Sequence, residues 1–118
     1  MATGTIQRKP IYGNLNSSGE VACKTTLTYT GKYITVPAGS YCCIEALAYY
    51  NAAAPSSVSI NSSSTNANAT YAAGAYVTPM AGTSYSTYVS TDTTFYLWAK
   101  YATASNNTVA IRAWYVIP

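Results

Sequence analysis

The segment FYLWAKYATASNNTVAIRAWYVI, residues 95–117, decides the fold class that this sequence predicts. Every second side chain is apolar along 95–101, and the same alternation returns along 108–117. A period of two is typical of strands that bury one face. Because an Asn-rich turn at 104–107 separates the two runs, we expect them to pair as a β-hairpin.

The rest of the chain shows further strand patterns and almost no helix pattern. Turn residues, such as the Pro-Ala-Gly run at 37–39, separate short alternating runs. Further strands are expected at 21–30, 32–36, 40–50, 58–60, 75–78 and 84–89. Short strands in this number predict an all-β fold, a small antiparallel β-sandwich of jelly-roll-like arrangement.

A chain of 118 residues is expected to form one domain. We assign residues 20–118 to the β-sandwich head domain, and residues 1–19 to an N-terminal arm or a first strand that leads into it. The polar segment SSVSINSSSTNANAT at 56–70 is expected to be a long exposed loop, because it can bury little apolar surface.

Charge is scarce, and this restricts the possible functions. Six basic and three acidic residues stand among 118, and there is no histidine. Without histidine, the commonest general base and the imidazole metal ligands are missing. Only Arg8 and Lys9 are adjacent basic residues, so no polybasic surface for nucleic acid or anionic lipid is expected. We therefore predict a protein that is not an enzyme and uses no cofactor, no metal and no nucleic acid.

The three carboxylates, Glu20, Glu45 and Asp92, lie far apart in the sequence, which argues against a hard-cation site. Glu45 lies in an apolar strand and is expected to pair with a lysine or arginine. Asp92 lies in a Ser-Thr-Asp-Thr-Thr turn and is expected to hold backbone amides as an Asx turn. A glycosidase pair formed by Glu45 and Asp92 is the weakest alternative.

Tyrosine is the informative excess, with thirteen Tyr against one Phe. Tyrosine combines a large rigid ring with a hydrogen-bonding tip and is enriched at binding surfaces. The tyrosines in or beside polar segments are our candidate ligand-binding residues, namely Tyr71, Tyr76, Tyr85 and Tyr88. Four others are expected to fill the core and its rims, namely Tyr33, Tyr41, Tyr101 and Tyr115.

Both faces of the expected strand at 40–50 are largely apolar, which suggests that one of them is a contact between subunits. Trp98 and Trp114 project from the side of their strands opposite to the core residues, and in a hairpin they lie near each other. Their patch is the packing surface of a second sheet, a subunit interface or a ligand platform. The candidate interface residues are therefore Tyr49, Trp98 and Trp114.

Cysteine spacing predicts neither a metal site nor a disulfide framework. Cys23, Cys42 and Cys43 are interpreted as free thiols, with a bridge from Cys23 to one of the adjacent pair as the alternative.

The longest apolar runs are too short for a membrane helix, and no apolar segment follows the N-terminal positive charges, so neither membrane insertion nor a signal peptide is expected.

The run YITVPAGSY at 33–41, the Ser/Asn/Ala-rich middle, and the closing runs at 95–101 and 110–118 resemble the C-terminal head domains of bacteriophage tail fibres and related receptor-binding proteins. The resemblance covers residues 20–118. It implies a small β-sandwich head, usually a homotrimer, that is carried on a fibre of the virion and adheres to a bacterial surface saccharide or protein. It carries no catalytic residues, and this sequence lacks a heptad or collagen-like stalk.

Two other functions are compatible with the same residues. A structural virion protein, for capsid decoration or fibre assembly, would bury its Tyr-rich surface between subunits. A secreted bacterial surface or pilus-like adhesin would need a signal sequence in the complete gene.

Overall fold

The computed structural model describes residues 8–118, and its regular structure in this range is β-strand. Residues 1–7 of the expected N-terminal arm lie outside the described residues. The strands are β1 (Ile11–Cys23), β2 (Thr28–Val36), β3 (Ser40–Tyr49), β4 (Pro55–Asn61), β5 (Thr70–Val77), β6 (Met80–Val89), β7 (Thr93–Tyr101) and β8 (Ser105–Ile117). The expected all-β, antiparallel class is confirmed.

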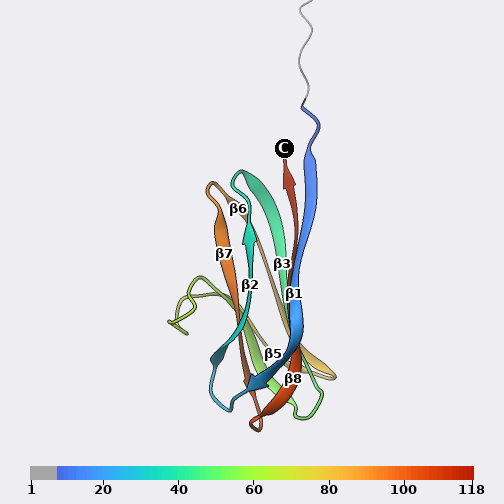
Figure 1. Ribbon diagram of the computed structural model, residues 1–118, viewed down its shortest axis with the longest axis vertical. Helices are drawn as coiled ribbons and strands as arrows, with labels where there is room; N and C mark the ends of the chain where they lie inside the picture. The colour runs from blue at the N-terminus through green and yellow to red at the C-terminus, as the bar shows by residue number, and fades with distance from the viewer. Residues whose placement is uncertain (1–7) are drawn as a thin grey trace, which may run out of the picture.

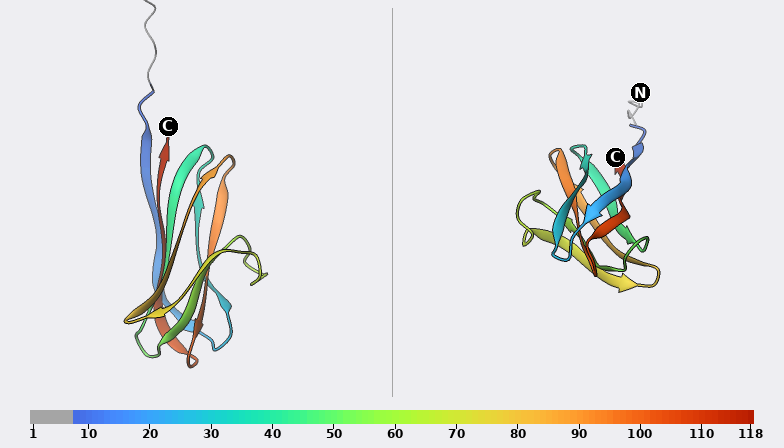
Figure 2. Two further views of the ribbon diagram at one scale, coloured as in Figure 1. Left: turned by 180° about the vertical axis from the view of Figure 1, so that it is seen from behind. Right: turned by 60° about the horizontal axis from the view of Figure 1, so that its bottom comes forward.

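The chain pairs like one long hairpin folded over on itself. β1 pairs with β8, β2 with β7, β3 with β6 and β4 with β5, all antiparallel. Further pairs join them in the order β1-β8-β3-β6-β5-β4-β7-β2, which is the strand order of a jelly roll. β1 and β2 are the first and last strands of this order, and they contact each other, so the sheet is nearly closed (Figure 1). The right-hand view of Figure 2 shows the strands around the core.

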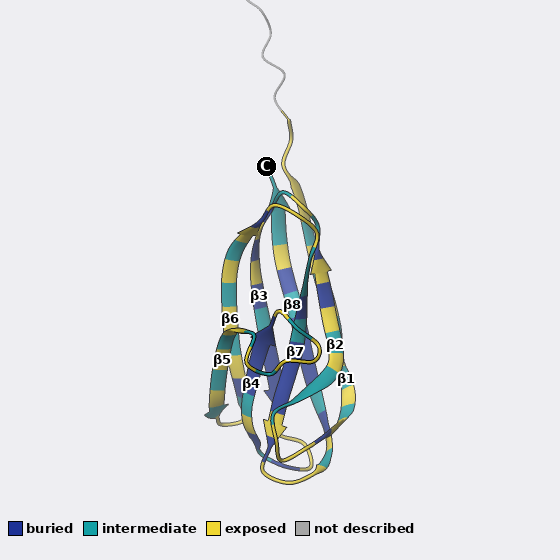
Figure 3. Ribbon diagram, turned by 90° about the vertical axis from the view of Figure 1, so that its left-hand side faces the viewer, coloured by how far each residue is buried: buried dark blue, intermediate teal, exposed yellow. Residues whose placement is uncertain are grey.

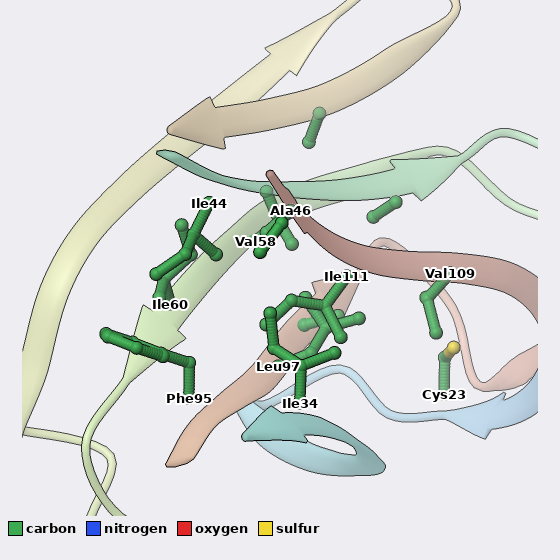
Figure 4. Packing of buried hydrophobic residues seen from close by; sticks show 14 of the residues in the cluster. Cys23, Ile34, Ile44, Ala46, Val58, Ile60, Phe95, Leu97, Val109 and Ile111 are labelled. Atoms are coloured by element: carbon green, nitrogen blue, oxygen red, sulfur yellow. The ribbon is translucent and has the colours of Figure 1, made fainter. Parts of the chain in front are cut away.

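Alternate residues of the strands fill this core. Ile44, Ile60, Leu97 and Ile111 are fully buried, and Phe95 packs with them (Figure 4). Figure 3 shows the result as bands of buried and exposed residues along the strands. Burying a side chain of this size stabilises the fold by roughly 1.5–3 kcal/mol.

The structure corrects the expected hairpin at 95–117. β7 pairs with β4 and β2, whereas β8 pairs with β1 and β3, so the turn after Tyr101 carries the chain from one side of the core to the other. Alternation predicted the buried face of each strand, because the same side chains point inward in either arrangement. The strands find their partners far away in sequence, which local turn signals do not encode.

Several expected segments have different bounds. The Asn-rich turn expected at 104–107 lies largely within β8, and the chain turns at 102–104 instead. The chain leaves strand conformation at residues 24–27, inside the expected strand 21–30, and β1 runs through the expected domain boundary at 19/20. The strand expected at 58–60 is confirmed within β4, where Val58 and Ile60 are fully buried, so the loop expected at 56–70 is wrong in its first part.

The remaining loop, residues 62–69, is held against the strands by side chains that donate hydrogen bonds to its backbone carbonyls. The buried Asn61 donates through Nδ2 to the carbonyl groups of Asn66 and Ala67, at 3.1 and 3.3 Å. Trp98 donates its indole N–H to the Ser63 carbonyl at 2.8 Å. A low-complexity segment is thus held by one buried amide and one indole.

Two further expectations about polar groups and cysteines are resolved. Asp92 accepts a hydrogen bond from the backbone amide of Ala38 at 2.8 Å, so it ties the β6–β7 connection to the β2–β3 turn instead of forming a local Asx turn.

All three cysteines are free, as the favoured interpretation expected. Cys23 pairs opposite Ser105 and Cys42 opposite Tyr115, about 33 Å apart along β8, so the alternative bridge between those two cysteines is excluded.

Candidate functional site

The outward surface of β1, β8, β3 and β6, here called the 1-8-3-6 face, carries the candidate site. The register of these strands arranges twelve of its outward residues, those nearer the C-terminus, in three rows of four. The first row is Tyr12, Val116, Tyr41 and Tyr88. The second is Asn14, Trp114, Cys43 and Ser86, and the third is Asn16, Arg112, Glu45 and Ser84.

Four aromatic side chains on this face, here called the aromatic cluster, are unusually exposed. Tyr12 is 76% exposed, Tyr41 56%, Tyr88 50% and Trp114 49%. The rings of Tyr41 and Tyr88 contact each other, with centroids 4.8 Å apart. The cluster surrounds an open depression of about 550 Å³ with Cys43 in its lining. Large exposed apolar patches of this kind mark interaction sites.

Trp114 is the centre of the site. It lines the depression described above, a second one of about 340 Å³ shared with Tyr12 and Asn14, and a third of about 170 Å³ shared with Asn16 and Arg112. Three adjoining hollows therefore meet at one half-exposed indole ring.

A charged pair borders the aromatic cluster. The Arg112 Nε donates to Glu45 Oε1 at 2.6 Å, and Nη2 of the same guanidinium contacts the same oxygen. The guanidinium carbon also lies 5.6 Å from the Trp114 ring centroid, within cation–π range. The expected pairing of Glu45 with a basic residue is confirmed.

Three of the four candidate ligand-binding tyrosines border a common depression, and the fourth lies apart. Tyr88 belongs to the aromatic cluster. Tyr71 and Tyr85 stack with ring centroids 4.8 Å apart and pack on Phe95, where they cover the core between β5 and β6. Both line a depression of about 190 Å³ to which Tyr88 also contributes. Tyr76 lies elsewhere, with its ring 6.3 Å from that of Tyr50.

The three candidate interface residues are also separated. Trp114 lies in the aromatic cluster, whereas Trp98 lies on the opposite side of the molecule and is only 6% exposed beneath the 62–69 loop. The expected proximity of the two tryptophans is wrong because β7 and β8 do not pair. Tyr49 is half-buried at the end of β3, opposite Met80.

Sequence reasoning missed two members of the aromatic cluster, Tyr12 and Tyr41. Tyr41 was expected to fill the core or its rims together with Tyr33, yet these side chains are 56% and 54% exposed. Tyr41 is next to the buried Cys42, and adjacent residues of a strand point to opposite faces, so the sequence pattern already placed Tyr41 on the outward face. The core assignment is confirmed for Tyr101, whereas Tyr115 is partly buried and packs against the core.

Neither a metal-binding cluster nor a membrane-spanning helix is found in the part of the chain that the structure describes. Within residues 8–118 no group of three or more Cys, Asp or Glu side chains is placed to hold a metal ion. In the same range no helix has the length and apolarity to cross a membrane. Compared with known proteins, the chain matches no family model and no curated sequence significantly.

Proposed function

We propose that this chain is a non-enzymatic adhesion domain, of the kind that heads phage tail fibres. In this proposal the aromatic cluster attaches a homotrimeric fibre of the virion to a saccharide or protein on the bacterial surface. The observation that carries the proposal is the convergence of three hollows on Trp114, amid tyrosines that are at least half exposed.

Physical arguments support an adhesive role for this face. Tyrosine and tryptophan offer a large contact area and lose few rotatable bonds on binding, which is why they dominate binding hot spots. Strand pairing fixes the backbone beneath the rings, and the contacts of Tyr41 with Tyr88 and of Arg112 with Trp114 restrain three of the side chains, which lowers the entropy cost of binding.

Adhesion to a panel of bacterial strains tests the proposal. The protein is labelled at its amino groups, which leaves Cys43 unmodified. Trp114→Ala and Tyr41→Ser are expected to weaken adhesion by about tenfold or more, because each removes part of a central contact. Tyr33→Ser is the matched control, since Tyr33 is 54% exposed against 56% for Tyr41 but lies on the other side of the molecule.

Two outcomes contradict this proposal. One is adhesion that survives Trp114→Ala, whether or not Tyr33→Ser reduces it. The other is a wild-type protein that adheres to no strain of the panel.

A structural virion protein is the second candidate, favoured by one observation. The aromatic cluster lies toward the end of the molecule where the C-terminus and the start of β1 are found (Figure 1), which is where a fibre would continue. In that case a sister chain covers the cluster, and Trp114→Ala reduces the assembled mass measured by light scattering. Under the adhesion proposal the variant keeps its assembly state and loses only adhesion.

A further inference from the structure

We infer that the ligand of the 1-8-3-6 face is an uncharged glycan and that Glu45 sets this selectivity by neutralising Arg112. This inference rests on the proposed adhesive function and deepens it. Among the twelve outward residues of the three rows, Arg112 and Glu45 are the charged ones. Because they pair with each other, the site offers no net charge to a ligand.

The geometry of the pair leaves hydrogen-bonding groups available. Both polar contacts of the Arg112 guanidinium, through Nε and Nη2, go to a single carboxylate oxygen, Oε1 of Glu45. Neither Oε2 of Glu45 nor Nη1 of Arg112 has a hydrogen-bond partner among residues 8–118. The Arg112 and Glu45 side chains are 42% and 33% exposed, so a ligand can reach them. The pair therefore presents N–H donors beside a carboxylate acceptor.

This arrangement matches the chemistry of a neutral pyranose. One face of such a sugar ring carries C–H groups, which pack on an aromatic ring such as Trp114. Its neighbouring hydroxyl groups both donate and accept, so they satisfy the carboxylate and the guanidinium together. Asn14, Asn16 and Ser86 surround these groups with further donors and acceptors.

The extent of the face indicates a short oligosaccharide rather than a single sugar. From β6 to β1 the face spans three strand spacings, about 14 Å. The hollows around Trp114 follow this direction, from Tyr88 on β6 to Asn14 on β1.

The same geometry disfavours an acidic glycan. The carboxylate of Glu45 repels a second carboxylate or a phosphate, and it already occupies the guanidinium that would bind one. Removing the charge of Glu45 exposes an unneutralised Arg112 beside Trp114. Arg8 and Lys9 precede β1 and lie outside the three rows.

An array of immobilised oligosaccharides tests the inference, with neutral hexose and deoxyhexose probes beside uronic-acid, sialic-acid and phosphate-bearing probes. Wild type is expected to bind neutral probes. Glu45→Gln is expected to gain affinity for acidic probes by about tenfold, since a guanidinium–anion hydrogen bond becomes available. The gained binding should weaken as salt is added.

Two control variants separate selectivity from net charge and from misfolding. Glu20→Gln changes the net charge by the same amount. Glu20 lies on the same face of β1 but opposite Thr108, two rows beyond Arg112, so no gain is expected. Arg112→Gln should lose neutral probes without gaining acidic ones. Thermal unfolding checks that each variant is folded, which is expected because both side chains of the pair are partly exposed.

The outcomes distinguish this inference from the proposed function. If cell adhesion requires Trp114 while wild type prefers acidic probes or binds no neutral one, the glycan inference is wrong and the adhesive function stands. Equal gains in Glu45→Gln and Glu20→Gln also overturn the role of Glu45. If cell adhesion does not depend on Trp114, the proposed function itself fails.

Discussion

Replacing Asn107 by alanine is expected to loosen the junction between the β3–β4 connection and the start of β8. The side chain of Asn107 is fully buried. Its Oδ1 accepts the backbone amides of Asn51, Ala52 and Ala53 at 3.3, 2.9 and 3.1 Å. Its Nδ2 donates to the Ser105 hydroxyl at 2.9 Å. The side-chain amide of Asn107 thus satisfies backbone N–H groups of the β3–β4 connection that no strand partner reaches.

The cost of Asn107→Ala follows from the exposure of these partners. Asn51 and Ala52 are exposed, so water can take over their amides, whereas Ala53 is only 6% exposed. An unpaired buried amide costs roughly 1–3 kcal/mol, and each further lost hydrogen bond about 0.5–1.5 kcal/mol. We therefore expect a destabilisation of about 3 kcal/mol. In a domain of this size this lowers the Tm by about 12 °C.

Urea and thermal unfolding, followed by circular dichroism, measure this destabilisation. Asn106→Ala is the matched control, because Asn106 is the exposed neighbour on the same strand. It should change the free energy of unfolding by less than about 0.5 kcal/mol. If Asn107→Ala lies within about 1 kcal/mol of this control, the argument that one buried amide fastens the junction is refuted.

The remaining predictions concern titration and thiol reactivity. Burial raises the pKa of the Tyr101 hydroxyl above its ordinary value of 10.0 and those of the Cys23 and Cys42 thiols above 9.0. The unfolded chain therefore loses these protons first, so the free energy of unfolding should fall as the pH rises above about 9, and a flat alkaline profile would contradict this. Tyr101→Phe should reduce the alkaline slope while lowering stability at neutral pH, because the hydroxyl donates to the Tyr49 carbonyl at 2.8 Å. Cys43 is exposed and should be alkylated quickly in the native protein, whereas the buried Cys23 and Cys42 should react only on unfolding, as mass spectrometry of the adducts can show.

The sequence predicted the class of fold and the inward face of the long strands, because burial imposes a period of two. It did not predict strand pairing. The partners of β7 and β8 come from distant parts of the chain, and the turn at 102–104 is equally compatible with a hairpin and with a crossing between the two sides. The loop predicted at 56–70 was too long for a related reason, since the strand also predicted at 58–60 is extended and buried by long-range pairing with β7.

The candidate site was predicted only in part. An excess of tyrosine indicated a binding surface, and Tyr88 and Trp114 were among the named residues. Tyr12 and Tyr41 join them only because β1, β8, β3 and β6 are neighbours in the sheet. Conversely, Tyr71 and Tyr85 stand in polar sequence but cover the core where β5 and β6 separate, a role that depends on the three-dimensional path of the strands.

Alkylation of Cys43 tests most directly whether the aromatic cluster is the surface that touches the bacterial cell. Cys43 lies in the lining of the large depression, beside Trp114 in the register of β3 and β8. A cysteine placed by Y33C in a C43S background reports on the opposite side of the molecule. If the aromatic cluster is the contact surface, cell-bound protein is alkylated at Cys43 far more slowly than free protein, while the control cysteine reacts at an unchanged rate. Equal rates at Cys43 in the free and the cell-bound protein would contradict it.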